Sequence, residues 1–124
     1  SGFTLSQFEQ AVSDLHKRNI PVITHLILGL PGETKEDMLS SVRYVGSLPV
    51  TGIKLQLLHI LKGTDLGTAY MADPFPLFTL EEYCDLIADC IALLPPEIVI
   101  HRLTGDGPRN LLLAPLWSTD KKEF

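Results

Sequence analysis

Residues 26–34 read LILGLPGET, an apolar run that stops at two glycines, a proline and an acid. The run belongs to a longer stretch over 20–30 that is rich in β-branched residues, which predicts a strand covered on both faces. Glycine and proline predict a tight turn after it, and Thr34 is placed to cap a following helix. The turn is either a plain connection between strand and helix or one wall of a ligand site.

The same patterns recur along the chain. Apolar residues at helical spacing predict helices, whereas apolar runs and period-two alternation predict strands. The segment 62–78, punctuated by glycine and proline, predicts a loop. A capping box is expected at Thr79, and for the first helix either Thr4 with Gln7 or Ser6 with Glu9 could form one. The expected helices cover 4–18, 34–48 and 79–94, and the expected strands cover 20–30, 52–61 and 97–103.

This αβαβαβ order predicts an α/β fold. Helices between successive strands imply parallel pairing with right-handed crossovers, as in a doubly wound sheet or part of an α/β barrel. Three strands are few for either, and at least one edge of such a sheet stays unpaired. The connections are too short for separate domains, so we expect residues 1–124 to form a single domain that belongs to a larger barrel or has an obligate partner.

Composition narrows the function classes. The chain has 10 basic and 15 acidic residues, a net charge of −5, which leaves no broad cationic face for a nucleic-acid backbone. Cys84 and Cys90 lie six apart in an expected helix, which predicts reduced core residues rather than a disulfide framework or a zinc site. The sequence shows no secretory signal, no apolar stretch of about 18 residues and no nucleophile-elbow motif. We expect a cytoplasmic protein without a membrane partner.

Four segments carry a resemblance to a known family. They read LILGLPGET, IKLQLLHILKGTDL, LLPPEIVIHRLTGDGPR and APLWS, in this order over nearly the whole chain. Together they resemble radical S-adenosylmethionine (SAM) enzymes, and most closely an uncharacterised bacterial family related to the Elongator catalytic subunit and to oxygen-independent coproporphyrinogen oxidase. The Cys-x3-Cys-x2-Cys motif that binds the cluster in these enzymes does not occur in this sequence. The resemblance implies a parallel three-stranded segment that forms the C-terminal half of a TIM-like partial barrel.

The resemblance also implies cofactors. The parent enzyme, an oxidoreductase or transferase, would hold SAM and a [4Fe-4S] cluster and cleave SAM reductively to a 5'-deoxyadenosyl radical that acts on an unknown substrate. We expect this chain alone to be inactive and to bind neither cofactor and no metal by itself. Glycine backbone and a helix N-terminus suit close approach by a nucleoside or a carboxylate. By resemblance, contacts to the adenosine of SAM fall to Ile27, Gly29, Pro31, Gly32, Glu33, Leu58, His59 and Ile60.

Polar residues on the expected strands form a second candidate site. Lys54 and Gln56 alternate with apolar neighbours and therefore share one face, which in a barrel is the lumen. His25 and either His101 or Arg102 could join them as a wall that recognises substrate. For each histidine the alternative is a hydrogen-bonded core residue, and for Lys54 it is a solvated edge.

A Gly-rich loop over 104–109 is the third feature. Arg109 and open backbone N–H groups could bind a phosphate or carboxylate there, whereas a plain turn held by Asp106 is the alternative. A comparable Gly-Thr turn follows Lys62, which we do not expect to be catalytic.

Two functions remain open on the sequence alone. The chain is either part of a radical SAM enzyme, supplying adenosine contacts and the substrate-side wall, or an autonomous non-catalytic module that binds a small anionic or nucleotide ligand. The expected partners are the missing N-terminal half-barrel and, through exposed sheet edges, a second copy of the chain. Resemblance to the Elongator subunit suggests tRNA, but the net charge of −5 gives that partner no support.

Overall fold

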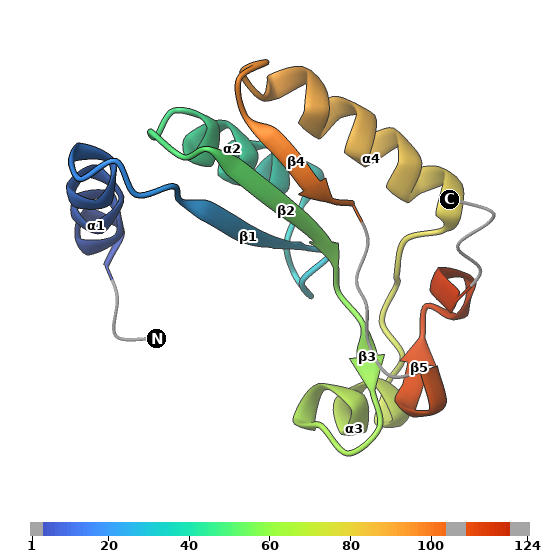
Figure 1. Ribbon diagram of the computed structural model, residues 1–124. Helices are drawn as coiled ribbons and strands as arrows, with labels where there is room; N and C mark the ends of the chain where they lie inside the picture. Colours follow the sequence, from blue (N-terminus) through green and yellow to red (C-terminus); the bar gives the residue numbers. More distant parts are fainter. Residues whose placement is uncertain (1–3, 104–108, 120–124) are drawn as a thin grey trace.

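The computed structural model describes residues 4–103 and 109–119. Helices and strands alternate through the first part of the chain, and short elements follow (Figure 1). In chain order they are α1 (Leu5–Lys17), β1 (Ile23–Leu28), α2 (Lys35–Gly46), β2 (Gly52–Leu57), β3 (Ile60–Leu61), α3 (Asp65–Ala72), α4 (Leu80–Leu93), β4 (Val99–Arg102), η1 (Arg109–Leu111), β5 (Leu112–Ala114) and η2 (Leu116–Thr119).

A three-stranded parallel sheet organises the chain. Its strand order is β1–β2–β4, with Ile23 level with Gly52 and Gly52 level with Val99. A β-bulge interrupts the β2–β4 register after Ile53. The structure therefore confirms the predicted α/β class with parallel strands, and β1 and β4 each have one strand neighbour among the described residues.

One face of this sheet carries the core. Ile53, Leu55 and Leu57 of β2 are at most 3% exposed and pack in one cluster with buried side chains of α2 and α4. Alternate residues of a strand point to opposite faces, so Gly52, Lys54 and Gln56 project to the other face. The helix-side members of the cluster are Met38, Val42, Val45, Tyr83, Leu86, Ile87 and Cys90. We call the first side the covered face and the second the open face.

Helix α1 lies beside β1 and α2. Its capping box pairs Thr4 with Gln7, as predicted, and Tyr44 of α2 donates a 2.7 Å hydrogen bond to Glu9. Of its apolar stripe, Val12 is buried and Phe8 is half-buried against the core. Leu5 and Leu15, which helical spacing places on the same apolar stripe, are both exposed.

Three local predictions need correction. Strand β1 is covered on one face instead of two, because α2 and α4 pack on the same side and leave Ile23 and Ile27 each 43% exposed. The expected strand 52–61 divides at Leu58 and His59 into β2 and β3. The expected loop 62–78 contains α3, which Thr64 caps by accepting a hydrogen bond from Gly67 N.

The two cysteines differ in environment. Cys90 is fully buried in the core, as predicted, whereas Cys84 is exposed on α4, so its assignment to the core is wrong. Both are free thiols. Within residues 4–103 and 109–119, every helix falls short of the length and apolar character that a bilayer-spanning helix needs.

Candidate functional site at the carboxyl ends of the strands

The GLPGE turn ends β1 at the carboxyl edge of the sheet. Glu33 N donates a 3.0 Å hydrogen bond to Leu30 O, with Pro31 and Gly32 as the two central residues. Gly32 has φ of 82°, and proline followed by a left-handed glycine is typical of a type II turn. Thr34 then caps α2 reciprocally with Asp37, through bonds of 2.9 and 3.1 Å. This sequence of residues reverses the chain within a few residues and begins the helix at once.

Glycine is required at position 29 for a different reason. Its φ is 93°, and a Cβ built there would lie 3.3 Å from the ring of Phe78. The segment Phe75–Phe78, which leads into α4, therefore packs closely against the backbone of the turn. Trp117 holds this segment from the far side, because its Nε1 donates a 2.8 Å hydrogen bond to Phe78 O.

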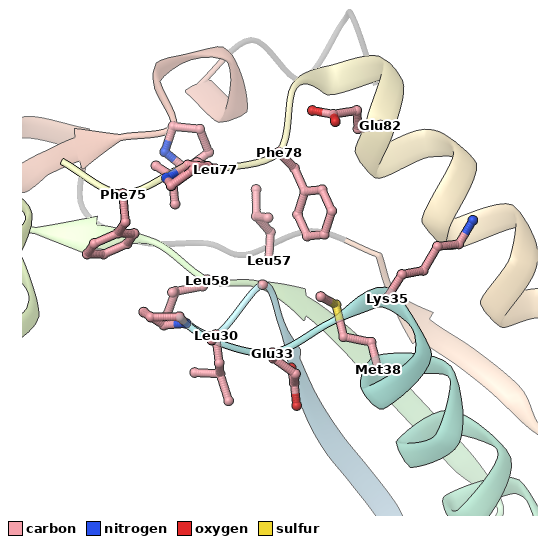
Figure 2. Close-up of a pocket in the computed structure, with 15 residues that line it drawn as sticks. Leu30, Glu33, Lys35, Met38, Leu57, Leu58, Phe75, Leu77, Phe78 and Glu82 are labelled. Atoms are coloured by element: carbon pink, nitrogen blue, oxygen red, sulfur yellow. The ribbon is translucent and has the colours of Figure 1, made fainter.

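A pocket of about 380 Å³ lies between the turn and the Phe75–Phe78 segment. In Figure 2 the rings of Phe75 and Phe78 lie on one side and the turn lies on the other, with the side chains of Leu30 and Glu33 directed away from the rings. Its volume is within the range of small-molecule sites, and its walls are mainly apolar. The lining residues are Gly29, Leu30, Pro31, Gly32, Glu33, Lys35, Met38, Leu57, Leu58, Phe75, Pro76, Leu77, Phe78, Glu82 and Pro115.

Glu33 is the polar residue of this pocket that the described chain leaves without a hydrogen bond. Its Oε1 is buried and has no partner among the described residues, and its carboxyl group points away from the two rings in Figure 2. Burial, with a smaller contribution from Asp37, raises the pKa of Glu33 above its ordinary value. Lys35, by contrast, is committed to Asp89 of α4 at 2.7 Å. Glu33 therefore offers an acceptor without a partner among the described residues, on the side of the turn away from the two rings.

The predicted adenosine contacts divide between three places. Gly29, Pro31, Gly32, Glu33 and Leu58 line the pocket. The side chain of Ile27 lies on the open face beside Gln56, its partner in the register. His59 is half-buried between β2 and β3, and Ile60 is fully buried, so a contact from Ile60 would have to come from its backbone. The adenosine role of all eight residues stays a prediction.

The predicted substrate residues come together more closely. His25 pairs with Lys54, and Lys54 pairs with Arg102, so the three stand in one row across the sheet. His101 is the extra residue at the bulge, and its imidazole lies over Gly52 on the open face. Arg109 begins η1, but its side chain and the loop 104–108 lie outside the described residues.

Sequence reasoning missed the aromatic wall of the pocket. Phe75 and Phe78 fall in a segment interpreted as a plain loop, and Lys35 was not singled out. The pattern PFPLF at 74–78 was the available signal, because two prolines that hold large apolar residues next to a helix cap indicate an ordered segment.

The pocket is compatible with the expected SAM, whereas the cysteines do not fit the expected [4Fe-4S] cluster. The open glycine backbone, apolar walls and unpaired Glu33 oxygen fit the adenosine part of SAM. A [4Fe-4S] cluster usually takes four Cys thiolates, whereas this chain has two cysteines in different environments on α4. Among the described residues, no three His, Cys, Asp or Glu side chains gather as a metal site. Cluster ligands would have to come from outside this chain.

Parallel strands, crossover helices and a pocket at the strand carboxyl ends define an α/β protein of the kind that binds its ligands at that edge. Comparison with known proteins identifies the family. Residues 50–124 match the Radical SAM C-terminal domain, and the chain belongs to this family.

Named relatives agree with this assignment. The chain is 39% identical over 116 residues to the uncharacterized protein YtqA of Bacillus subtilis, covering 94% of this chain and 36% of YtqA. It is 34% identical over 120 residues to the protein YhcC of Escherichia coli, covering 97% of this chain and 39% of YhcC. The chain thus spans a little over a third of the length of these relatives.

A solved structure supports the fold. The archaeal Elp3 of Methanocaldococcus infernus, with residues 1–46 deleted, matches 90% of this chain and 27% of its own, with a TM-score of 0.73 and 20% identity. At that identity the likeness concerns the fold alone. In sequence, the chain is 30% identical over 94 residues to Elongator complex protein 3 of Schizosaccharomyces pombe, covering 73% of this chain and 17% of that protein.

Proposed function

We propose that this chain forms the adenosine-contacting edge and the substrate-side wall of a radical SAM enzyme. The observation that carries the proposal is the GLPGE turn, which presents left-handed glycines and an unpaired carboxylate oxygen beside a 380 Å³ pocket in a chain of this family. When bound, a reduced [4Fe-4S] cluster would supply the electron for cleavage of SAM, and the residues of this pocket would hold the adenosine part of SAM. The rest of the enzyme supplies the cluster ligands.

The residues of the pocket have separable roles in holding the nucleoside. Phe75, Phe78 and Leu58 offer apolar surface to the base, because aromatic rings stack well on flat heteroaromatic groups. Gly29 and Gly32 let backbone approach the ligand without interference from a Cβ. Glu33 accepts a hydrogen bond from a ribose hydroxyl or an amino group, which satisfies its buried oxygen. These residues bind and orient the cofactor and perform no bond chemistry themselves.

The test uses the full-length protein with a reconstituted cluster and measures 5'-deoxyadenosine formation against SAM concentration. Glu33→Ala is expected to raise the KM for SAM about tenfold, because it removes a charge-assisted hydrogen bond. Glu36→Ala is the matched control, since Glu36 is an exposed acid in the first turn of α2. An unchanged KM in Glu33→Ala, or no 5'-deoxyadenosine from the well-reconstituted parent protein, would contradict the proposal.

Stability measurements separate a binding role from a structural one. Removing a half-buried carboxylate whose Oε1 has no partner among the described residues is expected to leave the melting temperature of the unliganded protein unchanged or higher. If Glu33 had only a structural role, Glu33→Ala would instead lower the melting temperature and the SAM affinity together.

A further inference from the structure

The open face of the sheet carries an excess of cationic and hydrogen-bond-donating groups. His25, Lys54 and Arg102 stand level on adjacent strands, and His101 lies next to them over Gly52. Adjacent strands lie about 4.8 Å apart, so the row spans about 10 Å. This row comes from three segments far apart in the sequence, and we call it the cationic row after Lys54 and Arg102.

Within residues 4–103 and 109–119, no acid is paired with the cationic row. The open-face positions of β1 and β2 are Ile23, His25, Ile27, Gly52, Lys54 and Gln56, none of which is acidic. Among the described residues, no carboxylate lies within ion-pair distance of Lys54 or Arg102, whereas Lys35 on the covered side is paired with Asp89. In a chain of net charge −5, four basic side chains with no acidic partner among the described residues favour the approach of an anion.

The surroundings indicate the size and class of that anion. Ile23 and Ile27 on β1 and Val99 on β4 flank the cationic row and are 43%, 43% and 57% exposed. On β1 both open-face neighbours of the row are apolar, whereas on the central strand they are Gly52 and Gln56. The exposed apolar side chains favour a ligand in which an apolar body is attached to the anionic group. A tetrahedral phosphate accepts hydrogen bonds from several directions, which suits an ammonium, a guanidinium and imidazole N–H donors arranged across three strands.

We propose that the cationic row binds the phosphate group of a small phosphorylated substrate. This inference rests on the proposed function, in which the open face is the substrate side of the enzyme. Lys54 occupies the centre of the row and contributes its ammonium group. Arg102 and His25 bind the phosphate from the neighbouring strands, while Gln56 and Ile27, one step toward the carboxyl edge, contact the body of the substrate.

The test is a titration of the isotopically labelled 124-residue chain with inorganic phosphate, followed by NMR chemical shifts. Saturable shifts are expected at His25, Lys54 and Arg102, with a dissociation constant of about 1–10 mM for the bare anion. Lys54→Met is expected to weaken binding about tenfold, and Lys54→Arg to restore most of it. Lys62→Met, which removes an exposed lysine outside the sheet, is the matched control and should leave binding unchanged.

Several results would overturn the inference. They are the absence of saturable shifts beyond those of sodium chloride at matched ionic strength, equal weakening by Lys62→Met, and equal affinity for acetate. A fourth is tighter binding of a single-stranded oligonucleotide with a salt dependence equivalent to more than about three phosphates, which would indicate a nucleic-acid track.

The outcome is independent of SAM cleavage. If phosphate binds and the parent protein forms no 5'-deoxyadenosine, the proposed function fails and the anion site stands. If 5'-deoxyadenosine forms normally but phosphate does not bind, only this inference fails.

Discussion

The two faces of the parallel sheet are built from alternate residues of the same strands, yet they differ in almost every physical property. On β2, Ile53, Leu55 and Leu57 are buried under helices, whereas Lys54 and Gln56 remain half-exposed between them. The covered face holds the fold together by burial of apolar surface. The open face retains the groups that can recognise a ligand. Because side chains alternate along β2, every second residue contributes to stability and the residues between them are available for recognition of a ligand.

The largest expected effect distinguishes the faces directly. Leu55→Ala removes a fully buried side chain, so it should lower the free energy of unfolding by about 2–5 kcal/mol. Gln56→Ala, one residue further on the open face, should change it by less than about 0.5 kcal/mol. Denaturant unfolding of both variants measures the difference. Similar losses from the two would contradict the assignment of the faces.

Gly52 is the exception on the open face, because there even a methyl group has no room. A Cβ at this position would lie 2.5 Å from His101 Nε2 and 3.2 Å from Val99 O. Gly52→Ala is therefore expected to cost about 1 kcal/mol, at the low end for overpacking because the imidazole can move.

A double-mutant cycle checks this explanation. If His101 causes the strain, the Gly52→Ala, His101→Ala double variant recovers most of the loss, and the coupling appears in thermal unfolding. Additive effects of the two substitutions would show that His101 is not the obstacle.

The contrast between the faces also explains what the sequence could predict. The alternation around Lys54 identified the open face, and the capping boxes at Thr34 and Thr79 marked helix starts, because these are local patterns. A shared wall of Lys54, Gln56, His25 and either His101 or Arg102 could be predicted. Which residues stand level depends on strand pairing and on a bulge that no local pattern encodes.

Tertiary packing accounts for the failures. Strand β1 is as apolar as a strand covered on both faces, but both helices pack on the same side of it. The Phe78 wall forms because Trp117, from the end of the chain, bonds to its carbonyl group. Helix α3 was missed because the glycines in its sequence were interpreted as loop signals. Gly67 is nevertheless required in this helix, because a Cβ there would collide with Leu61 O. Such contacts join distant segments and are invisible in short windows.

At the rim between the faces, two neighbouring acids should respond to pH with opposite signs. Burial raises the pKa of Glu33 above its ordinary 4.5, so its ionisation opposes folding, and this cost appears as pH rises from about 4.5 through the higher folded value. Hydrogen bonds from Thr34 lower the pKa of Asp37 below 3.8, so its stabilising contribution is lost as pH falls through the folded value.

Matched substitutions read out these signs. At neutral pH, Glu33→Gln should be slightly more stable than wild type, and the gain should vanish below about pH 4. Asp37→Asn should be less stable at neutral pH, and the two unfolding curves should converge in acid. Melting temperatures measured from acidic to neutral pH test both. If the stability of Glu33→Gln relative to wild type falls as pH rises, the sign that we assign to Glu33 is wrong.

The smallest effect concerns the helix over the covered face. Cys84 is exposed on α4, whereas Cys90 is buried in the core, where burial raises the pKa of its thiol to about 11. A thiol reagent at neutral pH should therefore modify Cys84 rapidly and Cys90 only when the protein opens. Mass spectrometry after Cys84→Ser isolates the slow site. Equal rates would show that α4 does not stay packed against the sheet.

The central claim is that the GLPGE turn and the neighbouring pocket hold the adenosine of SAM. Its most direct test is photo-crosslinking of the reconstituted full-length protein with a SAM analogue that carries a photoreactive adenine, followed by peptide mapping. We predict crosslinks to residues 29–33, to Leu58 or to the Phe75–Phe78 segment, and their loss when excess SAM competes. Crosslinks that fall entirely outside this chain, with equal competition by SAM, would contradict the claim.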